Sequence, residues 1–121
     1  MSPRLLIVDD SSLIRRAIQR ALGETRFSEI RSAGNGAEAL RVFKTYPAEI
    51  ITMDITMPEI DGISCVETMI QLRPSSRILV VSALADQATA IEAMTRGAEG
   101  FLLKPFTPEE LCEAIDDLLQ D

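Results

Sequence analysis

Short apolar runs alternate along the chain with stretches whose apolar residues recur at helical spacing. Five of the short runs are rich in leucine and β-branched residues, and they predict strands at Arg4–Val8, Glu29–Ser32, Glu49–Met53, Arg77–Val81 and Gly100–Leu103. Leu5–Val8 and Ile78–Val81 are continuously apolar, which is typical of strands covered on both faces. The pattern therefore predicts an α/β fold, a doubly wound parallel sheet of five strands with helices on both faces.

The segments between and after these runs show the periodicity of amphipathic helices. The last helix has the strongest start signal: Thr107 is placed to cap it, Pro108 to begin its first turn, and Glu110 to close a capping box. Between elements, Gly34-Asn35-Gly36 and Asp61-Gly62 predict turns. No internal repeat or low-complexity segment interrupts the alternation, so residues 1–121 are expected to form a single domain.

The segment from Asp86 to Arg96 carries more apolar positions than one narrow core-facing stripe requires. These positions are Ala88, Ala90, Ile91, Ala93 and Met94. Extra contact with the core would account for them, and so would a surface that binds a partner protein. Both explanations stay open at this point.

Composition narrows the classes of function. With 46% hydrophobic and 26% charged residues, the chain of 121 residues has enough apolar material for a core. Its net charge of −7 and its lack of histidine argue against nucleic-acid binding through a basic face and against attraction to an anionic membrane. Cys65 and Cys112 are expected to be small buried thiols. Because there is no signal segment and no apolar run of ~18 residues, a reducing cytoplasm is the expected compartment.

Polar residues follow four of the five predicted strands. Asp9 and Asp10 follow the first strand, Asp54 the third, Ser82 the fourth and Lys104 the fifth. In an open parallel sheet, ligands bind beyond the carboxyl ends of the strands, at the point where the strand order reverses. If the order is 2-1-3-4-5, the first and third strands are neighbours and the three carboxylates converge in one crevice.

Such a cluster needs a counter-charge, because carboxylates within ~5 Å of one another repel strongly. Mg²⁺ suits it, since this ion takes one or two carboxylates, keeps several waters and binds phosphate oxygens. A remaining carboxylate is then free to attack phosphorus and form an aspartyl phosphate. Mg²⁺, the Lys104 ammonium and the Ser82 hydroxyl would neutralise charge on the phosphoryl oxygens during such a transfer. The pattern therefore favours a phosphoryl-accepting site centred on Asp54.

The motifs that carry these residues resemble the receiver domain of two-component response regulators over nearly the whole chain. They are Leu6-Ile7-Val8-Asp9-Asp10-Ser11, Met53-Asp54-Ile55-Thr56-Met57-Pro58 with Asp61-Gly62, Val81-Ser82-Ala83 and Phe101-Leu102-Leu103-Lys104-Pro105-Phe106. The resemblance implies a flavodoxin-like fold with the strand order 2-1-3-4-5. The order used above is the one known for this family and does not follow from the residues alone.

The resemblance also implies roles for individual residues. Asp54 would accept a phosphoryl group from a phosphohistidine on a partner sensor histidine kinase. Asp10, Asp54 and the backbone carbonyl of Thr56 would hold Mg²⁺ directly, and Asp9 would assist through water. Lys104 would contact the phosphoryl oxygens.

A second set of roles concerns the response to phosphorylation. Ser82 would be drawn toward the phosphoryl group, and the space it leaves would let Phe101 swing inward. This movement would change the surface formed by the fourth helix, fifth strand and fifth helix. In this family the bond between Lys104 and Pro105 is often cis.

The kind of receiver is a separate question. The sequence resembles the stand-alone chemotaxis regulators of this family most, which would place an output partner such as a flagellar switch component on the changed surface. The alternative is an isolated receiver domain of a larger response regulator or hybrid kinase. The last helix lacks the basic residues expected on the dimer face of the winged-helix transcription factors; its acidic residues are Glu109, Glu110, Glu113, Asp116 and Asp117.

Two other classes use related chemistry. A phosphatase of the haloacid dehalogenase type also has an aspartyl nucleophile and Mg²⁺, but its two aspartates are separated by one residue, whereas Asp9 and Asp10 are adjacent. A flavodoxin would need a loop rich in glycine or threonine after the first strand to bind the flavin phosphate, whereas here that strand is followed by Asp9-Asp10-Ser11, without glycine. The chain is therefore expected to be a switch with only self-phosphorylation and self-dephosphorylation chemistry, and not a turnover enzyme.

Overall fold

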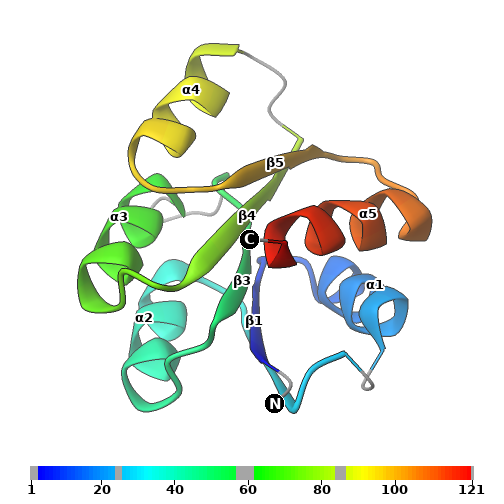
Figure 1. The fold of residues 1–121 in the computed structure, drawn as a ribbon, viewed down its shortest axis with the longest axis horizontal. Helices are drawn as coiled ribbons and strands as arrows, with labels where there is room; N and C mark the ends of the chain where they lie inside the picture. The colour runs from blue at the N-terminus through cyan, green and yellow to red at the C-terminus, as the bar shows by residue number, and fades with distance from the viewer. Residues whose placement is uncertain (1–2, 24–25, 57–61, 84–86, 121) are drawn as a thin grey trace.

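The computed structural model describes residues 3–23, 26–56, 62–83 and 87–120. Within these ranges strands and helices alternate strictly along the chain (Figure 1). The strands are β1 (Arg4–Val8), β2 (Glu29–Ala33), β3 (Ile50–Met53), β4 (Arg77–Ser82) and β5 (Gly100–Leu103). The helices are α1 (Ser12–Leu22), α2 (Gly36–Thr45), α3 (Gly62–Leu72), α4 (Gln87–Thr95) and α5 (Pro108–Leu119).

The sheet has the strand order β2-β1-β3-β4-β5, with all four pairs parallel, which confirms the predicted topology. The register of the central pair places Val8 opposite Met53 at the carboxyl ends of β1 and β3. The amide of Asp54 continues the ladder by donating to the carbonyl oxygen of Val8 at 2.9 Å. The acidic residues that follow the two strands therefore leave the sheet side by side.

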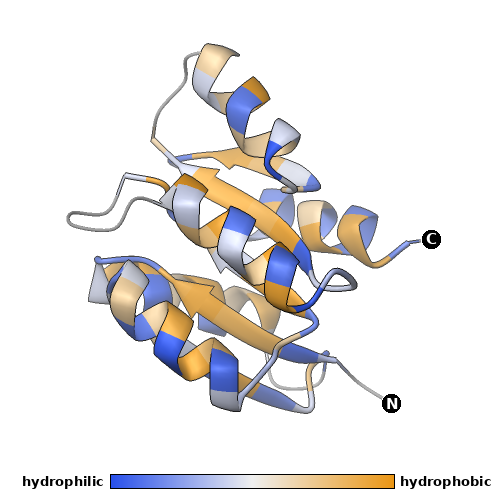
Figure 2. Cartoon of the chain, turned by 90° about the vertical axis from the view of Figure 1, so that its left-hand side faces the viewer, coloured by the Kyte–Doolittle hydropathy of each residue, from blue (hydrophilic) through white to orange (hydrophobic). Residues whose placement is uncertain are grey.

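Helices cover both faces of the sheet, with α1 and α5 on one side and α2, α3 and α4 on the other (Figure 1). Because side chains alternate between the faces of a strand, β1 contributes Leu5 and Ile7 to one core and Leu6 and Val8 to the other. The central strands β1, β3 and β4 are mostly apolar, whereas the edge strand β2 is largely polar and the helices are amphipathic (Figure 2). Among the described helices, none is long and apolar enough to cross a membrane.

Element boundaries differ from the predicted ones by single residues. The capping box of α5 is present as predicted, with Thr107 as N-cap and Glu110 reaching back to its backbone. Gly36 and Gly62, which were expected in turns, are the first residues of α2 and α3. Helix α4 is described from residue 87, so its predicted start at Asp86 lies outside the described residues.

At the amino ends of the strands, farthest from the acidic residues, β3 starts at Ile50 and not at Glu49 as predicted. The Glu49 carboxylate accepts hydrogen bonds from the amide and the guanidinium of Arg4, at 2.6 Å and 3.0 Å, and from the guanidinium of Arg73 at 3.2 Å. The Glu49 carbonyl oxygen still accepts from the Arg77 amide of β4 at 2.8 Å, but the Arg4 amide of β1 bonds to the Glu49 carboxylate, so the β1–β3 pairing begins at Leu5 and Ile50. Burial acts to raise the pKa of Glu49, but the hydrogen bonds from Arg4 outweigh it and the net pKa is lowered.

The predicted buried thiols are only partly confirmed. Cys65 of α3 is fully buried in the core, whereas Cys112 is half-buried in α5.

One buried hydroxyl leads to a stability prediction. Thr52 is fully buried in β3, between Ile7 and Leu79 of the neighbouring strands, and its Oγ1 has no hydrogen-bond partner among the described residues. We expect Thr52→Val to raise the free energy of unfolding by about 1 kcal/mol, because valine has nearly the same shape without the unsatisfied hydroxyl. Urea denaturation at pH 7 measures the change, with Thr52→Ala, which leaves a cavity, as a destabilised control.

Candidate functional site

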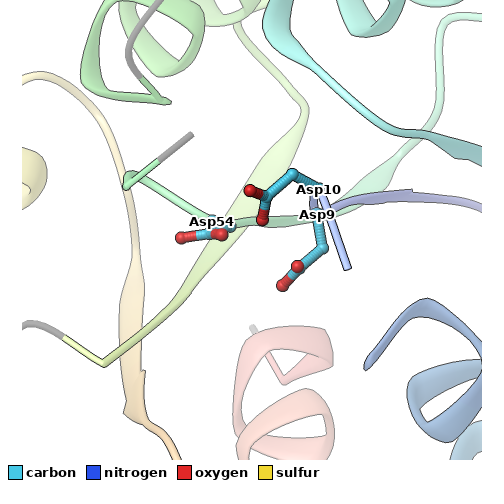
Figure 3. A group of neighbouring side chains, drawn as sticks. All are labelled: Asp9, Asp10 and Asp54. Atoms are coloured by element: carbon cyan, nitrogen blue, oxygen red, sulfur yellow. The ribbon is translucent and has the colours of Figure 1, made fainter. Parts of the chain in front are cut away.

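The three predicted carboxylates meet at the carboxyl ends of β1 and β3. Each of Asp9, Asp10 and Asp54 can offer one oxygen such that all three oxygens lie within 4.8 Å of one another. Figure 3 shows the side chain of Asp10 reaching toward Asp54, with Asp9 on the other side of the β1 end. Asp9 and Asp54 are each only 1% exposed, whereas Asp10 is open to solvent. The cluster therefore has a buried floor and one exposed carboxylate at its mouth.

Lys104 supplies positive charge to the buried floor. Its Nζ donates to Asp9 Oδ2 at 2.7 Å and lies 3.6 Å from Asp54 Oδ2. The side chain reaches the site because Lys104 follows β5, and its amide donates to the Ser82 carbonyl oxygen at 2.9 Å, continuing the β4–β5 ladder. The Lys104–Pro105 bond is cis, as the resemblance implied. The pairing of Lys104 with Asp9 was not predicted, because the sequence alone gives no distance between the two side chains.

The electrostatic balance of the site shows in the Asp9 carboxyl group. Burial raises the pKa of Asp9, the hydrogen bonds from Lys104 and the Ser11 amide oppose this rise, and the charge of Asp54 adds to it. The net pKa is raised, so the ionised form of Asp9 is less stable here than in water. Another positive charge in the crevice would stabilise that ionised form.

Asp54 is held in a fixed orientation by its own loop. Its Oδ1 accepts hydrogen bonds from both the backbone amide and the hydroxyl of Thr56, at 2.9 Å and 2.6 Å. This leaves Oδ2 on the side of Lys104. From the sequence, Thr56 was expected to contribute only its backbone carbonyl. Its two hydrogen bonds to Asp54 were not predicted, although an aspartate followed two residues later by threonine is a local signal for such a turn.

The remaining two predicted residues lie at different depths. Ser82 is the last residue of β4 and is fully buried at the carboxyl edge of the sheet. Phe101 is the second residue of β5, opposite Val80, and is half-buried against the core on the α4 face. Ser82 thus lies at the carboxyl end of the sheet, which also carries the acidic residues, whereas Phe101 lies nearer the amino end of its strand.

The donor set suits a hard divalent cation. Three ionised carboxylates and one ammonium group give the crevice a charge of about −2, which a divalent ion would balance. All the candidate ligand atoms are carboxylate oxygens, and the exposed Asp10 leaves one side of the cluster open to water. The residues present therefore fit a divalent-metal site of the kind that keeps part of its water shell.

Comparisons with known proteins point to one family. The family model for the response regulator receiver domain matches residues 5–116, a stretch that contains every site residue discussed above. The chemotaxis protein CheY of Bacillus subtilis (strain 168) is 39% identical over 119 residues, which cover 98% of this chain and 99% of that protein.

Solved structures agree with the sequence comparisons. A chain in the crystal structure of the CheX–CheY–BeF3–Mg²⁺ complex from Borrelia burgdorferi superposes with a TM-score of 0.91 and 29% identity, covering 98% of this chain and 90% of that one. A response regulator from Burkholderia pseudomallei, solved with a phosphorylated aspartic acid, a calcium ion and citrate, has a TM-score of 0.83 and 32% identity. That match covers 92% of this chain and 65% of the other.

Proposed function

This chain belongs to the family of response regulator receiver domains, and on that premise we propose that it is a two-component signalling switch marked by a phosphoryl group on Asp54. One observation carries the proposal: the buried Asp54 has one oxygen held by Thr56 while the other lies beside Lys104. Receiver domains are signalling switches and are not generally classed as enzymes. We therefore assign the chain only the chemistry of its own phosphorylation and dephosphorylation.

In the proposed transfer, Asp54 Oδ2 is the nucleophile. It forms a bond to phosphorus as the phosphorus–nitrogen bond of a kinase phosphohistidine breaks, and the leaving imidazole takes up a proton. Lys104, now within 3.6 Å of Oδ2, would exchange its bond to Asp9 for one to a phosphoryl oxygen. Thr56 would keep the carboxylate oriented throughout the transfer.

We further propose Mg²⁺ as the resident cation. Asp10, Asp54 and the Thr56 carbonyl would hold it directly, and Asp9 through water. When bound, Mg²⁺ neutralises charge on the phosphoryl oxygens. The clustering of the three carboxylates supports this assignment, as does the Mg²⁺ in the related Borrelia complex.

The response is proposed to run from Ser82 to the surface of α4, β5 and α5. Ser82 would move toward the phosphoryl group and Phe101 would swing inward. Large apolar side chains on this surface are 58% exposed at Ile91, 42% at Met94 and 46% at Leu103, which suits a partner-binding face. We propose a sensor histidine kinase as donor and, by similarity to chemotaxis relatives, an output protein such as a flagellar switch component, both cytoplasmic.

The alternative is that the chain acts as the receiver of a larger response regulator or hybrid kinase. Binding of the phosphorylated chain to a flagellar switch protein separates the two proposals, since only a stand-alone chemotaxis regulator is expected to bind it.

A labelled phosphodonor tests the function itself. With Mg²⁺ and either a histidine kinase phosphorylated on its histidine or a small acyl phosphate, the wild type should incorporate label. Removal of Mg²⁺ by EDTA should abolish incorporation. Asp54→Ala should not be labelled, whereas Asp117→Ala, which removes an exposed acid on α5, should behave as the wild type does. Equal labelling of Asp54→Ala and the wild type would refute the proposal.

Thermal stability tests the cation separately from the phosphoryl transfer. We expect Mg²⁺ to stabilise the fold by about 1.4 kcal/mol at ten times its dissociation constant, because it binds the folded state and relieves carboxylate repulsion. Thermal melts with MgCl₂, compared with NaCl of equal ionic strength, detect this effect. Asp10→Asn should lose most of the Mg²⁺ response, and an unchanged response in this variant would show that the metal assignment is wrong.

A further inference from the structure

Arg15, which none of the assigned roles uses, contacts the acidic turn from α1. Its guanidinium Nη1 donates to the backbone carbonyl oxygen of Asp9 at 2.6 Å. Hydrogen bonds from a charged donor are shorter and stronger than neutral ones. The side chain is half-buried, whereas the neighbouring Arg16 is exposed.

The carbonyl that Arg15 holds belongs to the peptide unit joining Asp9 to Asp10. This unit is planar, so fixing its oxygen also fixes the plane from which the Asp10 side chain departs. Other bonds hold the Asp9 side of the turn: its amide donates to the Ala33 carbonyl at 3.1 Å, and its carboxylate accepts from the Ser11 amide at 2.9 Å. The Asp10 carboxylate is exposed, so its direction depends on this backbone more than on packing.

The β2–α2 loop leaves room for the guanidinium. A Cβ atom placed on Gly34 would lie only 3.3 Å from Arg15 Nη1, closer than an ordinary van der Waals contact. The same loop is fixed in turn, because the Gly34 amide donates to Glu38 Oε1 at 2.5 Å. Arg15 therefore lies between two loops at the site edge of the sheet, with its donor directed at one of them.

We propose that Arg15 is a positioning residue for the cation site, orienting the peptide between Asp9 and Asp10 so that Asp10 faces Asp54. The inference rests on the proposed function, because it assumes that the three carboxylates bind Mg²⁺. The direction in which Mg²⁺ affinity changes when Arg15 is removed separates positioning from a simple charge effect. Charge alone predicts that losing a nearby guanidinium strengthens cation binding, whereas positioning predicts that the same loss weakens it.

The test measures Mg²⁺ binding without any phosphodonor. Isothermal titration of Arg15→Met should give a dissociation constant about tenfold higher than that of the wild type, as is usual for partners that orient a metal ligand. Arg16→Met removes the same charge from the next residue and should bind as the wild type does or slightly more tightly. Arg15→Lys keeps a donor and should recover part of the affinity.

A metal-free readout accompanies the titration. In Arg15→Met without Mg²⁺, the amide resonances of Asp9 and Asp10 should shift or broaden in ¹⁵N spectra, while Arg16→Met should leave them unchanged. If the wild type binds Mg²⁺ and Arg15→Met binds it as tightly or more tightly, the inference is overturned while the proposed function stands. If the wild type itself binds no Mg²⁺, both the metal assignment and the role of Arg15 are overturned.

Discussion

Replacing Lys104 with methionine is expected to lower the free energy of unfolding of the metal-free protein by about 3 kcal/mol at pH 8, because it leaves two buried carboxylates without their shared cation. Asp9 and Asp54 are each 1% exposed, and Lys104 Nζ lies 2.7 Å and 3.6 Å from their Oδ2 atoms. Methionine keeps the apolar stem of the lysine, so the loss reports the charge and not a cavity. Denaturant titration followed by circular dichroism measures it.

The pH dependence identifies the cause of this loss. Burial already raises the pKa of Asp9, and removing the opposing bond from Lys104 should raise it further. A raised carboxyl pKa means that the folded state holds the proton more tightly than the unfolded state, so stability falls as pH rises through this range. The deficit of Lys104→Met should therefore be smaller at pH 4.5 than at pH 8. A deficit independent of pH would contradict the electrostatic explanation.

The chain offers a matched control for this variant. Its only other lysine is Lys44, which is exposed in the last turn of α2. Lys44→Met should change the free energy of unfolding by no more than about 0.5 kcal/mol at either pH, as is usual for surface substitutions. Saturating Mg²⁺ should also recover part of the stability lost in Lys104→Met, because the cation supplies the missing counter-charge.

Gly62→Ala is expected to destabilise the fold by about 3 kcal/mol through crowding of backbone around the phosphoacceptor. A Cβ atom at Gly62 would lie 2.4 Å from the Asp54 carbonyl oxygen and 2.5 Å from the Ile55 Cα, distances at which something must move. Gly62 begins α3 and its φ is not in the left-handed region, so the glycine is needed for space. In an uncrowded helix, alanine would instead be more favourable by about 1 kcal/mol.

A second glycine separates crowding from backbone preference. Gly23 has a φ of +67°, but a Cβ atom there would meet nothing within 4 Å. At Gly23 the cost of alanine is purely conformational, about 1 to 3 kcal/mol, because a positive φ combined with a ψ of 172° is a backbone conformation that glycine alone adopts readily. Chemical denaturation measures both variants. A loss of less than about 1 kcal/mol in Gly62→Ala would show that the close approach of α3 to the Asp54 backbone does not limit stability.

The sequence predicted the fold well because its signals were local or periodic. Continuous apolar runs such as Leu5–Val8 identify strands buried on both faces, and Thr107 with Glu110 identifies the start of α5 from side-chain chemistry alone. Boundaries were less certain where a residue's hydrogen bonds come from distant segments. Glu49 was placed in a strand, whereas β3 begins at Ile50 and the Glu49 carboxylate bonds to Arg4 and Arg73 at the amino end of the sheet.

For the site, the sequence predicted which strand ends carry the acidic residues, but not how their side chains pair. The bond between Lys104 and Asp9 joins residues 95 positions apart, and the contact of Arg15 with the Asp9 carbonyl depends on the direction of α1. Gly62 was interpreted as a turn residue, because sequence alone does not reveal which backbone approaches it. These features depend on packing in three dimensions and required coordinates.

Locating the phosphoryl group tests the proposed role of Asp54 most directly. The wild-type protein is treated with Mg²⁺ and a small acyl phosphate, digested, and analysed by tandem mass spectrometry under conditions that preserve acyl phosphates. One phosphoryl group per chain is expected, on Asp54, sensitive to hydroxylamine and absent when EDTA is present. A phosphoryl group on Asp9, Asp10 or a hydroxyl side chain, with Asp54 unmodified, would contradict that role.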